Sequence, residues 1–110
     1  MLNGECQTFV SDCHVRAAAA LLSHSWDPIV LSALRRGPLR RHDLLTGIGG
    51  ISDKVLTESL RRLRSRALIT RAAEPGGGAS YRLSPLGESL AEGPLAALAQ
   101  WAADHQSDLV

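Results

Sequence analysis

The sequence lacks the features of a membrane-bound or multidomain protein. It has 110 residues, only 4% of them aromatic, and its longest uninterrupted apolar run is the six residues 17–22. Because a membrane-spanning helix needs roughly 20 apolar residues, we expect no contact with a membrane. Residues 1–10 also lack the basic and apolar segments of a secretory signal, which favours a cytoplasmic protein. The length fits one domain, residues 1–110.

Cysteine is scarce, and motifs of catalysis or metal binding are missing. Cys6 and Cys13 are too few for a disulfide scaffold, and a reducing cytoplasm would keep them as thiols unless their oxidation is functional. Together with His14 they fit no zinc spacing, so we expect no metal and no cofactor. The glycines 76–78 are not followed by the Lys-Ser/Thr of a phosphate-binding loop, and no Ser-His-Asp pattern is present. We therefore expect a protein that is not an enzyme.

A formal net charge of +1 conceals a segregation of charge along the chain. Residues 35–82 hold eleven of the twelve Lys and Arg residues and four of the eleven Asp and Glu residues, a formal charge of +7. The rest of the chain has a formal charge of −6. A basic middle between acidic ends favours a polyanionic partner, although a charged face that is merely solvated remains the alternative.

The pattern of the chain predicts a mostly α protein with a small β-hairpin wing. Leu and Ala make up 33 of the 110 residues, and both favour helices. We expect helices over residues 11–22, from 26–28 up to Gly37, over 41–45, from a Ser52 cap to 65, and over 85–105 with a bend at Gly93 and Pro94. Gly47, Gly49 and Gly50 predict a turn, and the runs 67–71 and 80–83 predict a hairpin. Two short helices, a glycine turn and a hairpin are the arrangement of a winged helix-turn-helix, with the helix-turn-helix at 41–65 and the wing at 67–83.

The helix that follows Ser52 has the chemistry of a DNA-recognition helix. Leu56, Leu60 and Leu63 form one apolar stripe, which leaves a polar opposite face. Arg and Lys donate to guanine or phosphate, Glu accepts from cytosine, and Thr or Val contacts the thymine methyl group. Any amphipathic helix has a polar face, and the neighbouring turn and hairpin are what favour DNA binding. The predicted base contacts are Lys54, Val55, Thr57, Glu58, Arg61 and Arg62, and the predicted phosphate contacts are Ser52, Arg40, Arg41, Arg71 and Arg82.

With these motifs the chain resembles the HxlR-type winged-helix transcriptional regulators, relatives of the MarR group. The resemblance runs from about Cys13 to Trp101. The matching stretches are Gly37-Pro38-Leu39-Arg40, Asp43-Leu44, Gly50-Ile51-Ser52-Asp53-Lys54-Val55-Leu56, Leu60-Arg61-Arg62-Leu63, Leu68-Ile69-Thr70-Arg71, Tyr81-Arg82-Leu83-Ser84-Pro85-Leu86-Gly87, and Leu95, Leu98 and Trp101.

The resemblance implies a homodimer on a palindromic DNA operator, and we expect a repressor rather than an activator. Residues 1–10 would be an arm, and helices 11–22 and 85–105 would dimerise. These helices are also more apolar than a small core requires. The predicted interface residues are Ala17, Leu21, Leu22, Leu95, Leu98, Trp101 and Ala102. The alternative function is a winged-helix protein-interaction or dimerisation module that does not read DNA sequence.

Two ways of sensing a signal remain open. Family members often carry a cysteine about 13 residues before the tryptophan that opens the second helix, and in some it senses oxidants or electrophiles. The resemblance places this role on Cys13, which could instead be a buried structural side chain. Alternatively, Trp26 and Trp101 line a cavity for a small effector, unless both are core or interface anchors.

The sequence also departs from the family pattern at three places. Residues 23–25 are Ser-His-Ser in place of the usual Gly-Gly-Lys, and Arg41 replaces a phenylalanine. Either the stem of Arg41 covers the core, or the third helix sits differently. Residues 72–80 make a wing about two residues shorter than usual and without its arginine, which weakens the case for minor-groove contact.

Overall fold

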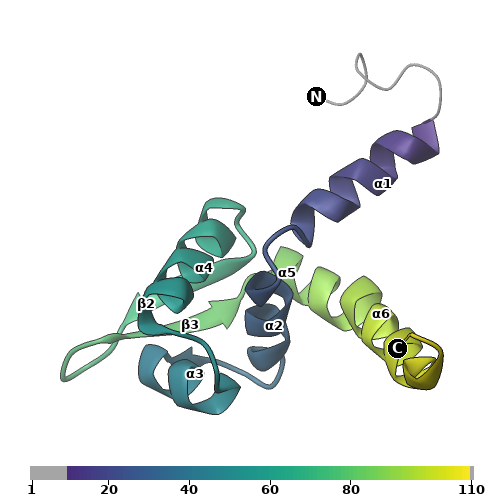
Figure 1. The fold of residues 1–110 in the computed structure, drawn as a ribbon. Coiled ribbons are helices and arrows are strands. Elements are labelled where there is room, and N and C mark those ends of the chain that lie inside the picture. Colours follow the sequence, from purple (N-terminus) through teal and green to yellow (C-terminus); the bar gives the residue numbers. More distant parts are fainter. Residues whose placement is uncertain (1–9, 110) are drawn as a thin grey trace.

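The fold is a small helical body with a three-stranded sheet and two outlying helical segments. A computed structural model describes residues 10–109. The helices are α1 Val10–Leu21, α2 Trp26–Ala33, α3 Arg41–Ile48, α4 Asp53–Ser65, α5 Pro85–Leu90, the π-helix η1 Ala91–Leu95, α6 Ala96–Asp104 and the 3₁₀-helix η2 Gln106–Asp108, and the strands are β1 Leu39–Arg40, β2 Ile69–Ala73 and β3 Ala79–Leu83. Figure 1 shows this arrangement, which confirms the predicted mostly α class with a hairpin wing.

The wing is the antiparallel hairpin of β2 and β3. Ile69 pairs with Leu83 and Ala73 with Ala79, and the glycines 76–78 turn the chain with positive φ angles. The predicted first run began at residue 67, but Ala67 has a φ of 61° and the strand starts two residues later. Strand β1 pairs with the other edge of β3, giving the order β1-β3-β2. We did not predict β1, because two residues are too few to show a strand period.

The core lies between α2, α3, α4 and the sheet. Leu34 of the turn after α2, Leu44 of α3 and Leu56 of α4 are almost completely buried. The predicted stripe on α4 is confirmed, since Leu60 and Leu63 are buried beside Leu56. This packing fixes which side of α4 is left to solvent.

The helix-turn-helix is formed by α3 and α4. Helix α3 is longer than predicted, because Gly47 lies inside it rather than in the turn. The turn instead uses Gly49 and Gly50, with φ angles of 69° and 74° that disfavour residues with a Cβ atom. The Ser52 cap is confirmed, with its Oγ accepting a hydrogen bond from the backbone N–H of Val55 at 3.1 Å.

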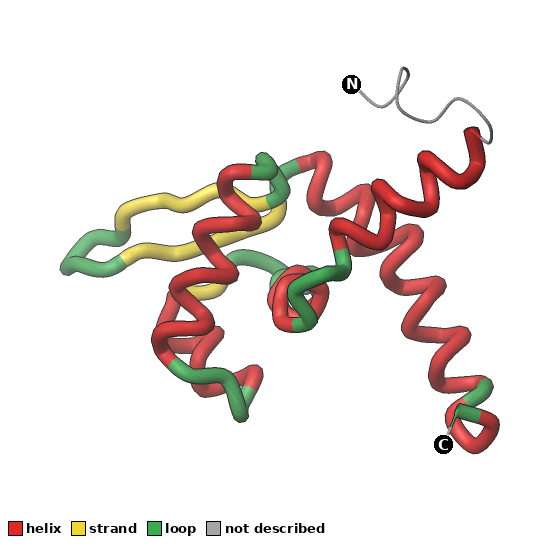
Figure 2. Tube along the Cα trace, turned by 45° about the horizontal axis from the view of Figure 1, so that its top comes forward, coloured by secondary structure: helices red, strands yellow, loops and turns green. Residues whose placement is uncertain are grey.

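Two helical segments leave the body in different directions, as Figures 1 and 2 show. One is α1 and the other is the run α5-η1-α6. The bend predicted at Gly93 and Pro94 takes the form of a π-helix, in which Pro94 contributes no N–H and the helix continues. No helix within residues 10–109 is long and apolar enough to span a bilayer. Apart from Val10, the arm expected at residues 1–10 lies outside the described residues.

The second segment is anchored to the wing at Gly87. A Cβ atom on this glycine would lie 1.9 Å from the carbonyl oxygen of Leu68, so only glycine fits. The neighbouring Ser84 donates from its Oγ to the carbonyl of Ala67 at 2.7 Å and from its N–H to that of Leu68 at 3.1 Å. Helix α5 is therefore in direct backbone contact with Leu68, the residue before β2.

Candidate nucleic-acid interface

The solvent side of α4 presents most of the predicted base contacts. Lys54, Thr57 and Arg61 are exposed, and Val55 and Glu58 are half-buried near them. The first turn of the helix also has free N–H groups, which carry partial positive charge. This face has both donors and acceptors for base edges and the cations to attract phosphate.

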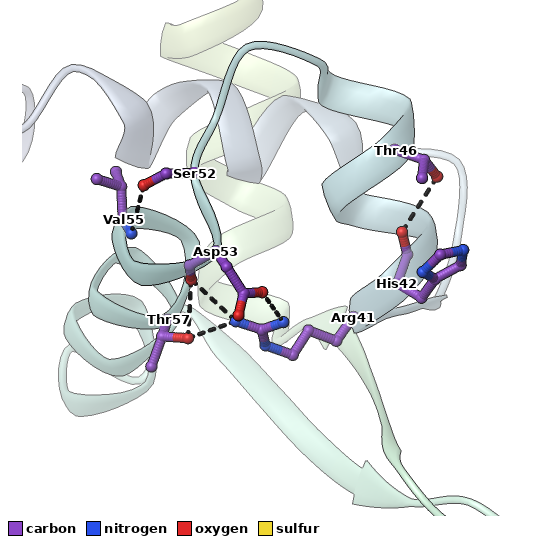
Figure 3. Close-up of polar contacts among 7 residues, drawn as sticks. All are labelled: Arg41, His42, Thr46, Ser52, Asp53, Val55 and Thr57. Carbon is purple, nitrogen blue, oxygen red and sulfur yellow. Dashed lines mark hydrogen bonds and ion pairs between the residues drawn. The ribbon is translucent and has the colours of Figure 1, made fainter.

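Arg41 joins the beginnings of the two helices of the motif (Figure 3). Its Nη1 donates to Oδ1 of Asp53 at 2.6 Å and its Nη2 to the backbone carbonyl of Asp53 at 2.9 Å. The same Nη2 donates to Oγ1 of Thr57, whose hydroxyl also bonds to the Asp53 carbonyl at 3.0 Å. The side chain that replaces the family's phenylalanine thus holds α3 against the first turn of α4. Sequence reasoning did not anticipate this contact.

Arg62 is placed differently from the other predicted contacts. It donates from Nε and Nη2 to the two carboxylate oxygens of Asp27 on α2, at 3.0 and 2.9 Å. Ser59 donates to the same carboxylate at 2.6 Å, and Asp27 is only 1% exposed. The guanidinium is therefore held against the core side of α4, and we leave Arg62 out of the proposed DNA surface.

The environment of Asp27 favours its charged form. Burial raises the pKa of its carboxyl, but the hydrogen bonds from Arg62 and Ser59 and the charge of Arg62 outweigh burial, so the pKa lies below its ordinary value. The hydrogen bond to Asp27 raises the pKa of Arg62 in turn. Sequence reasoning missed this site, although a carboxylate in the otherwise apolar α2 was a usable signal.

Among the arginines predicted to contact phosphate, some form ion pairs within the protein and others are exposed to solvent. Arg40 on β1 lies 3.3 Å from a carboxylate oxygen of Glu74 near the wing tip, and Ser80 donates to the same carboxylate at 2.9 Å. Arg71 and Arg82 are exposed. Arg71 pairs with Tyr81 in the sheet, and Arg82 is the next residue along the strand. The two arginines therefore lie on opposite faces of the wing.

Cys13, the residue predicted to sense oxidants, forms a disulfide in the structure. Cys13 is 4% exposed and disulfide-bonded, which is the oxidised alternative to the thiol expected in a reducing cytoplasm. Cys6 lies outside the described residues. Within the described part of the chain, no group of three or more His, Cys, Asp and Glu side chains could hold a metal ion.

The two tryptophans lie apart from the apolar cavity of the structure. Trp26 packs on the core beside Gly50, while Trp101 is 51% exposed and stacks on His105 with ring centroids 4.3 Å apart. A cavity of about 190 Å³ lies instead between α1, α2 and the C-terminal helices. Its lining residues are Ala18, Leu21, Leu22, Pro28, Leu31, Leu90, Pro94, Leu95 and Leu98.

Comparison with known proteins identifies the family. The model of the HxlR-like helix-turn-helix family matches residues 21–109, which include the whole helix-turn-helix and wing. The chain belongs to this family. An uncharacterised HTH-type transcriptional regulator of Escherichia coli, YtfH, is 37% identical over 99 residues, covering 88% of this chain and 78% of that protein. The family members found by sequence are thus named as transcriptional regulators.

Solved structures of the family share the fold. The transcriptional regulator YtfH of Salmonella typhimurium superposes with a TM-score of 0.73 at 33% identity, covering 84% of this chain and 86% of that one. The reduced form of YodB from Bacillus subtilis superposes with a TM-score of 0.71 at 27% identity, covering 82% of this chain and 88% of that one. YodB also has a quinone-bound structure, with a TM-score of 0.71 at 25% identity, covering 83% of this chain and 97% of that one.

Proposed function

We propose that the protein is a homodimeric, sequence-specific DNA-binding transcriptional regulator that acts as a repressor. The observation that carries the proposal is the exposed polar face of α4, set on a capped helix-turn-helix in a chain of the HxlR-like family. The protein would act in the cytoplasm by binding rather than by catalysis. Its partners would be double-stranded DNA with a palindromic operator and a second copy of itself.

The proposed DNA surface has a centre on α4 and a border of phosphate contacts. Lys54, Glu58 and Arg61 would contact base edges, with the side chains of Val55 and Thr57 against thymine methyl groups. The border would comprise Ser52, Arg40, Arg41, Arg71 and Arg82. Arg40 and Arg41 already have acidic partners, so Arg71 and Arg82 would carry more of the phosphate binding.

The dimer would form through the two outlying helical segments. Leu22 of the turn after α1 and Leu98 and Trp101 of α6 are between 42% and 51% exposed, although all three are large apolar side chains. A two-fold dimer would place the two α4 helices about one turn of DNA apart. The proposed interface is Ala17, Leu21, Leu22, Leu98, Trp101 and Ala102. Leu95, which was also predicted there, is 9% exposed and belongs to the core of the single chain.

For regulation we propose redox control through Cys13. The residue already forms a disulfide at the first helix, and the solved relative YodB has a reduced form and a quinone-bound form. The second candidate is an effector site. Here the apolar cavity of about 190 Å³ offers a better location than Trp26 and Trp101, because it lies between the proposed dimer helices and the body.

The test is fluorescence anisotropy of the reduced protein on the DNA upstream of its own gene, with a scrambled duplex as the control. We expect preference for the upstream duplex, loss of binding with mild oxidant and recovery with reductant. Cys13→Ser should bind DNA but ignore the oxidant. Arg61→Ala should weaken upstream binding by about 1–3 kcal/mol. Equal affinity of folded Arg61→Ala would remove Arg61 from the surface, and equal affinity for both duplexes would contradict sequence-specific binding.

Salt dependence separates this function from a protein-interaction module. A dimer with roughly 6–10 phosphate contacts should lose about 10³–10⁵ in affinity between 50 and 200 mM salt. An interface of leucine and tryptophan side chains should respond little. A partner bound with equal strength at both salt concentrations would favour the module.

A further inference from the structure

A second, smaller cavity lies on the flank of α4 that faces the sheet. Its volume is about 140 Å³. Four of its lining residues are spaced along α4 at positions i, i+3, i+4 and i+7, so they form one side of the helix. The cavity is lined by Thr57, Leu60, Arg61 and Arg64 of α4, Arg41 of α3 and Tyr81 of β3, with no acidic residue among them.

The cavity is lined by positive charge, most of which has no counter-charge within residues 10–109. Arg61 and Arg64 are exposed, and their guanidinium groups make no hydrogen bond or ion pair with any residue from 10 to 109. Arg41 is partly neutralised by Asp53. Arg71 lies directly opposite Tyr81 in the sheet register, so it adds a further cation on the same face.

Tyr81 contributes an unpartnered hydroxyl to this cavity. The residue is 7% exposed, and its hydroxyl makes no hydrogen bond with any residue from 10 to 109. Every fully buried side-chain nitrogen and oxygen in that part has a partner. The Tyr81 hydroxyl is therefore not sealed in the core, and Tyr81 itself is one of the residues that line the cavity. A buried ring with an open hydroxyl beside arginines is a donor set for an oxyanion.

We propose that this cavity binds a phosphate group of the DNA backbone through Arg64 and the Tyr81 hydroxyl, with Arg61 between this contact and the base edges. The inference rests on the proposed function. A helix is about 10–12 Å across and the major groove about 12 Å wide, so the flanks of a helix in the groove meet the phosphates that border it. The cavity lies on such a flank, and Arg61 stands between it and the outward face of α4. Arg64 was not among the residues predicted to contact DNA.

The first experiment compares Arg64→Gln with Arg36→Gln. Both remove one exposed arginine charge, but Arg36 lies in the turn between α2 and β1, away from this cavity. By anisotropy we expect Arg64→Gln to lose roughly tenfold in affinity, equally for the upstream and scrambled duplexes, and to lower the slope of log affinity against log salt by about 1. Tyr81→Phe should lose about two- to tenfold. Arg36→Gln should behave as the wild type.

A second experiment locates the phosphate. Single phosphates of the duplex are replaced in turn by neutral methylphosphonates. At one position in each half-site, the neutral phosphate should lower the affinity of the wild type. The same replacement should hardly change the affinity of Arg64→Gln, because that variant already lacks the contact. If every position weakens Arg64→Gln as much as the wild type, the proposal is wrong.

The outcomes separate this proposal from the function on which it rests. No binding of wild type to any DNA overturns both. Equal wild-type affinity for the two duplexes, with the loss in Arg64→Gln intact, overturns sequence-specific regulation but supports the phosphate contact. Wild-type DNA affinity in folded Arg64→Gln overturns the contact alone. In that case, loss of inorganic-phosphate binding in the variant, seen by NMR, would assign the cavity to a free phosphate.

Discussion

Arg62 of α4 and Asp27 of α2 form a two-pronged ion pair, with both carboxylate oxygens bonded within 3.0 Å. The pair lies beneath α4, on the side away from the proposed DNA surface. It fixes the rotation of α4 about its axis, because Ser59, three residues earlier on the same helix, binds the same carboxylate. The direction in which Lys54 and Arg61 point therefore depends on a charge buried at the start of α2.

Removing Arg62 should destabilise the fold strongly. Arg62→Ala leaves the Asp27 carboxylate buried without its counter-charge, which costs about 3–5 kcal/mol of unfolding free energy. Urea denaturation measures the loss, and Arg61→Ala on the exposed face, expected within about 0.5 kcal/mol of wild type, is the control. Equal stability of the two variants would contradict a structural role for the pair.

The contribution of Asp27 should disappear in acid. Since the pKa of Asp27 is lower in the folded state, its stabilisation is fully present above the unfolded-state pKa of about 3.9 and is lost as the pH falls through the lower folded value. The difference in unfolding free energy between wild type and Asp27→Asn should therefore be constant from pH 7 to about pH 5 and shrink below pH 4. A difference that stays unchanged down to pH 2.5 would argue against this linkage.

Arg41 should matter more for DNA binding than for stability. Its ion pair with Asp53 is largely exposed, and such pairs contribute about 0–1 kcal/mol. Arg41→Ala should nevertheless weaken DNA binding, because it leaves the Asp53 carboxylate unmasked beside the first turn of α4. Adding Asp53→Asn should restore part of the affinity in an anisotropy titration. Strictly additive losses in the double variant would show that Arg41 does not act through Asp53.

Two glycines of the C-terminal segment should respond in opposite ways to alanine. At Gly87 the new Cβ would overlap the Leu68 carbonyl, and we expect a loss of more than about 1–3 kcal/mol. At Gly93 nothing lies within 4 Å of the added atom, so Gly93→Ala should be neutral or stabilise by about 0.5–1 kcal/mol. Thermal unfolding of both variants decides, and similar melting temperatures would refute the backbone contact at Gly87.

The exposed side chains of α6 should control the oligomeric state. Sedimentation of the wild type should show a dimer, and Leu98→Ala with Trp101→Ala should shift it toward monomer at micromolar concentration. Leu86 on α5 is comparably exposed but outside the proposed interface, so Leu86→Ala is the matched control. An unchanged dimer in the double variant would place the interface elsewhere.

The parts of the fold that depend on local pattern were predictable from the sequence. The leucine stripe of α4, the Ser52 cap and the bend at Gly93 and Pro94 each follow from residues a few positions apart, although the sequence did not show that the bend is a π-helix. The missed features depend on residues distant in sequence. Asp27 meets Arg62 across 35 residues, and the two residues of β1 become a strand only because β3 is beside them. These long-range partners also decide which arginine side chains of the proposed DNA surface are already engaged within the protein.

The contact at Gly87 has a mechanical consequence. At Gly87 the backbone of α5 contacts the Leu68 backbone directly, so no side-chain rotamer can change to absorb a displacement. The hydroxyl of Ser84 also bonds to the Ala67 carbonyl, which joins the same two segments of the chain. Helix α5 and the base of the wing are therefore coupled rigidly at Leu68, so that a rotation of one must move the other. A tilt imposed on α5 would reach β2 without any repacking of the leucines beneath α4.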